Sequence, residues 1–161
     1  PNTIDINYLA GLIDGEGFFT INYRKNRQTI KCISHDFIPV VGVHMTALEL
    51  LKQIKQQYGG NLYTREGTNK IRADWSIRQA KNVYPFLIRL IPYLRVKKPQ
   101  ALIMKEFCER FKFFTGKKIH KLNNQEINQR KLIKQTIMHV NKMQTWIKSI
   151  ARKIWKVNFT N

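Results

Sequence analysis

Acidic residues are scarce in this sequence. Ten Asp and Glu accompany 29 Lys and Arg, which gives a formal net charge of +19 at pH 7. Because such an excess of one sign repels itself in a compact fold, it indicates a polyanionic partner. Nucleic acid is favoured over a membrane, since the sequence has no lipidation motif and no apolar run near the roughly 20 residues that cross a bilayer.

Cysteine is scarce too. Cys32 and Cys108 are far apart and form no CxxC pair, and the four histidines lack the spacing of zinc ligands. These absences argue against a disulfide framework and against a zinc-binding module. We expect an intracellular protein, either in an organelle (a chloroplast or mitochondrion) or in a prokaryotic cytoplasm.

The charge that is present is unevenly distributed. Residues 1–88 hold 11 basic and 7 acidic side chains, whereas residues 89–161 hold 18 and 3. Carboxylates retained in the first half of a polyanion binder need a purpose, and metal binding is one. With 161 residues, 43% of them apolar, the chain is predicted to form a single domain over residues 1–161.

Periodicity predicts an α+β fold with an antiparallel sheet. Residues 18–27 alternate between polar and apolar, as do residues 70–78, which indicates strands with one buried face. Thr46 and Glu49 suggest a capping box, and Trp146 and Trp155 are expected to anchor the basic C-terminal helices. The expected elements are a helix at 6–14, strands at 18–27 and within 29–43, a helix at 46–58, a hairpin of 61–66 and 70–78 that turns at 67–69, helices at 82–93 and 99–114, a loop at 115–124 and helices within 125–157.

The most informative segment reads Leu-Ala-Gly-Leu-Ile-Asp-Gly-Glu-Gly at residues 9–17. Gly11 and Gly15 are four residues apart, so they share one helix face and let another helix approach closely. In a symmetric dimer, the same helix of a second copy fits that face. Asp14 and Glu16 would then converge with their counterparts as a site for a hard cation such as Mg²⁺. The alternative is an ordinary short helix that ends at an Asp-Gly pair.

This nine-residue string resembles the signature of the LAGLIDADG homing endonucleases, with Gly15 in place of Ala and Glu16 in place of Asp. Residues 93–101 also resemble a basic segment near the active site of that family. The resemblance covers about residues 5–112 and leaves a basic helical extension of about residues 113–161. It implies a LAGLIDADG-like fold, in which an antiparallel β-sheet saddle packs against helices.

A single motif implies a homodimer in this family, with the motif helix at the dimer interface. The expected interface residues are Leu9, Ala10, Gly11, Leu12, Asp14 and Gly15.

The resemblance also implies a catalytic centre. Glu16 matches the acid that binds the divalent metal, and Gly15 supplies a nearby carbonyl. Lys97 matches the basic residue near the scissile phosphate, with Lys98 as the alternative register. Val43 stands where related proteins often carry a Gln that organises water, so His44 is a candidate substitute.

The polar faces of the strands are the predicted reading surface, since strands fit the DNA major groove. The alternative for each residue is an ordinary solvated sheet face. The candidate DNA-binding residues are Thr20, Asn22, Arg24, Asn26, Gln28, Arg65, Arg72, Ser76, Arg78 and Lys98.

The resemblance therefore implies a site-specific endonuclease that cuts both strands of a long, near-palindromic double-stranded DNA. Its cofactor would be Mg²⁺, or another divalent cation such as Mn²⁺ or Ca²⁺. Two alternatives remain open. One is an RNA-binding maturase that helps an intron RNA to fold, and the other is a DNA-binding protein of the same fold without cleavage activity.

Overall fold

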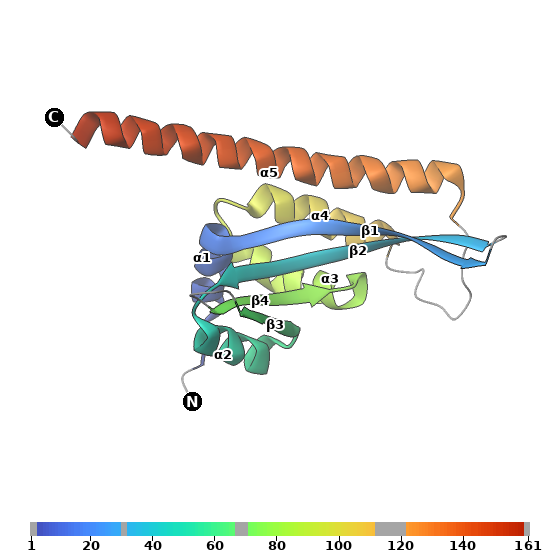
Figure 1. The fold of residues 1–161 in the computed structure, drawn as a ribbon, viewed down its shortest axis with the longest axis horizontal. Coiled ribbons are helices and arrows are strands. Elements are labelled where there is room, and N and C mark those ends of the chain that lie inside the picture. Colours follow the sequence, from blue (N-terminus) through green and yellow to red (C-terminus); the bar gives the residue numbers. More distant parts are fainter. Residues whose placement is uncertain (1–2, 30–31, 67–70, 112–121, 160–161) are drawn as a thin grey trace.

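The computed structural model of the protein describes residues 3–29, 32–66, 71–111 and 122–159 (Figure 1). For residues 26–29, 32–34, 66, 71 and 147–159 it describes the backbone alone. The elements in chain order are α1 (Ile6–Glu16), β1 (Gly17–Thr29), β2 (Cys32–Met45), α2 (Leu48–Tyr58), β3 (Asn61–Glu66), β4 (Ile71–Arg78), α3 (Ala80–Leu90), the 3-10 helix η1 (Ile91–Tyr93), α4 (Lys98–Phe111) and α5 (Asn124–Phe159). This arrangement confirms the predicted α+β class.

The four strands form one antiparallel sheet in the order β1-β2-β4-β3. The alternation read from the sequence decides which face is buried. Phe19 and Ile21 of β1, and Ala73, Trp75 and Ile77 of β4, all point into the core. The opposite face of the sheet therefore carries the polar side chains.

One hydrophobic core lies between the sheet and the helices. Leu9 and Ile13 of α1, Leu87 of α3 and Met104 of α4 are all fully buried in it, together with Trp75 of the sheet. Because α1 leads directly into β1, this packing sets the end of α1 against one end of the sheet (Figure 1).

The N-terminal helix is longer than expected, since α1 continues through Glu16 rather than ending at Asp14. Gly17 ends it, and its backbone N–H donates to the Ile13 carbonyl. An added Cβ at Gly17 would lie 2.6 Å from that carbonyl oxygen, so only glycine fits there.

The predicted capping box of α2 is wrong. The residue before the helix is Ala47 rather than Thr46, and it makes no side-chain cap. Glu49 instead pairs with Lys52 at 2.7 Å on the first turn. The region predicted as one or two strands within residues 29–43 is the single strand β2.

The C-terminal region forms one 36-residue helix, α5, rather than several (Figure 1). Trp146 does not anchor it, because its side chain is 66% exposed. The Trp155 side chain, the hairpin turn at 67–69 and residues 115–121 of the predicted loop lie outside the described part. Within the described ranges, no helix combines the length and the hydropathy that a bilayer crossing requires.

Candidate functional site

The Asp14 carboxylate, near the end of α1, holds a segment that is distant in the sequence. Its Oδ2 accepts the backbone N–H of Arg95 and its Oδ1 accepts that of Lys97, each at 2.8 Å. Hydrogen bonds to a charged acceptor are strong, so this pair sets the position of the chain between η1 and α4 relative to α1. Both oxygens of Asp14 thus bond within the subunit, and its place at a dimer interface stays a prediction.

Lys97 lies against the end of the motif helix. Its Nζ donates to the Ile13 carbonyl at 2.8 Å, and the residue is only 8% exposed. Carbonyl groups at a helix C-terminus carry partial negative charge, which stabilises a cation there. Lys98, the alternative in register, is exposed at the start of α4. The geometry therefore brings Lys97, rather than Lys98, to the end of α1.

Glu16 and Gly15 are both exposed on the last turn of α1. None of the ion pairs among the described residues involves Glu16. A carboxylate and a backbone carbonyl are the oxygen ligands that Mg²⁺ prefers, so the two residues fit the predicted metal role chemically. In the described part of the chain, no group of three or more His, Cys, Asp or Glu gathers into a metal site.

Only some of the predicted dimer-interface residues on α1 are accessible to a partner. Leu9 and Ala10 are completely buried in the subunit's own core, so their side chains have no surface left for a partner. Positions three or four apart on the opposite side of α1 are open to solvent in whole or in part: Tyr8, Gly11, Leu12 and Gly15. No atom lies within 4 Å of a Cβ built at Gly11 or at Gly15. Tyr8 belongs to this stripe, although the sequence reasoning did not include it.

A hollow of about 770 Å³ opens on the polar face of the sheet. Side chains from all four strands line it: Phe18, Thr20, Asn22, Val40, His44, Tyr63, Thr64, Arg65, Asp74 and Arg78. The hollow thus brings together four of the predicted DNA-binding residues and His44. The reasoning from sequence missed Asp74 as a site residue, although it alternates with Arg72 and Arg78 on the same face.

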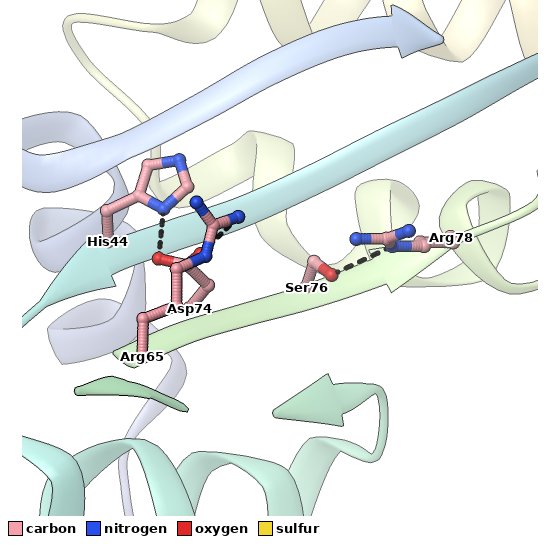
Figure 2. A network of polar contacts seen from close by, with 5 residues as sticks. All are labelled: His44, Arg65, Asp74, Ser76 and Arg78. Carbon is pink, nitrogen blue, oxygen red and sulfur yellow. Dashed lines mark hydrogen bonds and ion pairs between the residues drawn. The ribbon is translucent and has the colours of Figure 1, made fainter. Parts of the chain in front are cut away.

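His44 and Asp74 form the centre of a polar network in this hollow (Figure 2). His44 Nδ1 lies 2.6 Å from Asp74 Oδ1, and an Arg65 guanidinium nitrogen lies 3.6 Å from Asp74 Oδ2. Val43, the residue before His44, is fully buried on the other face of β2. The Val43 side chain therefore points into the core, and the His44 side chain points outward.

The remaining predicted DNA contacts differ in how far they reach solvent. Arg24 and Arg72 are exposed on the sheet. Ser76 is only 2% exposed, and its hydroxyl accepts from Arg78 Nε at 3.2 Å, so it can act on a ligand only through Arg78. The side chains of Asn26 and Gln28 lie outside the described part.

Cys108 is no candidate nucleophile. It is fully buried in the core, and burial raises the pKa of its thiol to about 12. A thiol needs its thiolate form to react, so this side chain is inert near neutral pH.

Solved structures with this fold include three homing endonucleases. I-CvuI bound to the I-CreI target in the presence of 2 mM Mg has a TM-score of 0.67 at 14% identity, covering 84% of this chain and 80% of that chain. The archaeal intron-encoded enzyme I-Vdi141I, complexed with DNA, has a TM-score of 0.64 at 19% identity, covering 84% and 82%. I-TnaI has a TM-score of 0.64 at 12% identity, covering 89% and 99%. At these identities the similarity establishes the fold, which is that of homing endonucleases.

The sequence itself establishes the family. The family model for LAGLIDADG endonucleases matches residues 9–110, which is more than half of the chain. No curated protein matches it in sequence. The chain therefore belongs to the LAGLIDADG endonuclease family, as its motif at residues 9–17 indicated.

Proposed function

We propose that this protein is a homodimeric, divalent-metal-dependent endonuclease that cuts both strands of a long, near-palindromic DNA. The observation that carries the proposal is the pair of hydrogen bonds that the backbone N–H groups of Arg95 and Lys97 donate to the Asp14 carboxylate. They hold a basic residue beside the exposed end of α1, where Glu16 offers a carboxylate. A cation and a carboxylate at one helix end are the parts that phosphodiester hydrolysis needs.

Each residue has a distinct part in that reaction. Glu16 and the Gly15 carbonyl would hold the metal, which polarises a phosphate and makes its bound water more acidic. Lys97 supplies a positive charge that stabilises the developing charge on the phosphate. Asp14 is a positioning residue, since it fixes the segment that carries Lys97. The solved relatives I-CvuI with Mg and I-CvuI with Ca support a divalent cation in this role.

The dimer follows from a single motif and from the open stripe of α1. Gly11 and Gly15 leave two positions of that stripe without a side chain, so the same helix of a second copy can approach closely there. The chain covers 80% of I-CvuI but only 40% of I-GzeII, as a one-motif chain would. Two subunits would join their sheets into one surface for about two turns of duplex.

Replacing Glu16 with Gln tests the catalytic part of the proposal. A duplex target is first selected from a randomised DNA library, and cleavage is then measured with Mg²⁺. We expect Glu16→Gln to lower the cleavage rate about 100-fold or more while DNA binding persists, because the amide binds the metal poorly. Chelation of Mg²⁺ should have the same effect on the wild type.

Glu49→Gln is the matched control, since Glu49 is an exposed carboxylate on α2 that pairs with Lys52. It should leave cleavage unchanged. Cleavage by Glu16→Gln at the wild-type rate would refute the metal assignment. Binding of the selected duplex without cleavage by the wild type would instead assign the chain to the DNA binders of this fold.

One observation favours a second function, that of an intron maturase. Val43 is fully buried and apolar where relatives often carry a water-organising Gln, and a net charge of +19 suits RNA as well as DNA. Tight binding to a structured intron RNA, together with no cleavage of any duplex, would decide for this alternative.

A further inference from the structure

We infer that His44, held in place by Asp74, reads the edge of one base pair at the inner end of each half-site, next to the centre of the target. The contact proposed is from the His44 Nε2 to an exocyclic amino group of adenine or cytosine in the major groove. This inference rests on the proposed function, because it names a specificity residue of the same DNA-binding surface. The sequence suggested a catalytic role for His44, whereas this inference assigns it to the DNA-reading surface.

The pairing with Asp74 decides which ring nitrogen faces outward. His44 Nδ1 and Asp74 Oδ1 are 2.6 Å apart. A carboxylate can only accept, so Nδ1 carries the proton and donates. The free polar atom of the ring is then Nε2, which points away from Asp74 in Figure 2. The His44 side chain is 59% exposed, so this atom is accessible to a ligand.

A second contact fixes the plane of the ring. Phe18 stacks on His44 with 4.3 Å between ring centroids and 10° between the planes. Gly42 makes room for this arrangement, because an added Cβ there would lie 2.7 Å from the Phe18 ring. His44 is thus held by a hydrogen bond along one ring edge and by an aromatic ring on one face. A group with so little freedom loses little entropy when it binds.

Asp74 is placed to orient His44 rather than to meet DNA itself. It is the only carboxylate that lines the described hollow, and its side chain is 22% exposed against 59% for His44 and 80% for Arg65. A free carboxylate would repel phosphates. Here the carboxylate lies beneath two nitrogen donors, one from His44 and one from Arg65. We therefore assign Asp74 as a positioning residue.

The sheet register shows where along the target the contact falls. Val43 pairs with Gly17, the residue that directly follows Glu16. His44 is the next residue of β2, so it lies at the end of the reading surface nearest the motif helix. The base pair that it contacts would be close to the cleaved phosphate, whereas Arg24 lies farther along β1.

The orientation of the ring selects the base. In the neutral ring with the proton on Nδ1, Nε2 is an acceptor. Adenine N6 and cytosine N4 are the hydrogen-bond donors of the major groove, whereas guanine and thymine present acceptors at the equivalent positions. We expect a preference for adenine or cytosine on the contacted strand.

The experiment compares the sequence preferences of variants of the full chain. Wild type, His44→Ala and Asp74→Asn are each used to select duplexes from a randomised library, with Ca²⁺ in place of Mg²⁺. We expect the wild type to prefer adenine or cytosine about tenfold at one position at the inner end of each half-site. Both variants should lose that preference and keep the preferences at the other positions.

A control variant and a second measurement distinguish the loss of His44 positioning from a general effect of removing a carboxylate. Glu49→Gln also converts an exposed carboxylate to an amide, but on α2, so it should keep the wild-type profile. Nitrogen-15 NMR of the histidine side chains should show His44 with its proton on Nδ1 in the wild type. In Asp74→Asn, the signal should shift toward the mixture of tautomers of a free imidazole.

Three outcomes would overturn the inference. One is a profile of His44→Ala or Asp74→Asn that equals that of the wild type. The second is a guanine preference at the position that changes, which would show that Nε2 donates. The third is slower single-turnover cleavage by His44→Ala with an unchanged profile, which would make His44 catalytic. A wild-type chain that selects no duplex would refute the proposed function as well.

Discussion

At the scale of single residues, two carboxylates of the motif have different tasks. Asp14 is engaged by two backbone N–H groups and organises the protein, whereas Glu16 is exposed and available to a ligand. Both side chains are carboxylates. Asp14 faces the segment that precedes α4, whereas Glu16 is exposed to solvent on the last turn of α1. Position on the helix, rather than chemistry, therefore decides which of the two carboxylates is held by the backbone.

Asn in place of Asp14 should weaken both stability and cleavage. The amide keeps one acceptor oxygen but opposes the second backbone N–H with a donor, so one of the two bonds is lost. We expect the free energy of unfolding to fall by about 1–3 kcal/mol in denaturant titration, and cleavage to fall further because Lys97 is no longer held. Asp5→Asn, at the other end of α1, is the control. Equal behaviour of the two variants would contradict this role for Asp14.

At the scale of elements, α5 packs against one of the two edge strands of the sheet. β1 is an edge strand, and such an edge presents unpaired backbone groups that invite aggregation. Asn141 of α5 donates from Nδ2 to the Phe19 carbonyl of β1 at 3.0 Å. Gln144 donates to the Val96 carbonyl at 2.7 Å, next to Lys97. The helix therefore connects the sheet edge to the segment that carries Lys97.

Asn141→Ala should loosen this connection. The Phe19 carbonyl would lose its partner from α5, at a cost of about 1–2 kcal/mol in the free energy of unfolding. Asn128→Ala is the matched control, since Asn128 is exposed on the same helix and should change stability little. Chemical denaturation of both variants measures the difference. Equal stability would mean that α5 does not depend on this bond.

At the scale of the whole molecule, the reading surface and the proposed dimer surface meet at the end of α1. The sheet face carries the arginines of the hollow, and the open stripe of α1 carries two glycines. The stripe lies on α1 and the hollow lies on the sheet, and the two share no residue. The two surfaces can therefore be tested separately, because substitutions on α1 need not touch the sheet.

Gly11→Leu should separate the subunits without unfolding them. Gly11 has open space around it in the subunit, and leucine is the better helix former, so the fold should persist. The added side chain would hold two motif helices apart and raise the dimer dissociation constant about tenfold or more. Sedimentation and circular dichroism check the two claims. Gln53→Leu, on the exposed side of α2, should stay dimeric, and an unchanged dimer in Gly11→Leu would place the interface elsewhere.

The sequence alone predicted most of the fold and the part of the candidate site that lies in the motif at residues 9–17. Alternation with a period of two predicted that Phe19, Ile21 and Trp75 lie in the core. Successive side chains of a strand point to opposite faces, and the apolar face is the one that is buried. The motif at residues 9–17 indicates the family without any knowledge of the fold. These features are local, so they can be read from neighbouring residues.

Only the tertiary structure decided which side chains meet. Asp14 contacts Lys97, 83 residues away in the sequence, and His44 contacts Asp74, 30 residues away. No local sequence pattern predicts contacts over such separations. The tertiary structure also showed that Leu9 and Ala10 are buried within the subunit and that Trp146 is exposed. The periodicity of each element can be read from the sequence. The partner of a polar side chain depends on how the elements pack, and this packing is a property of the whole chain.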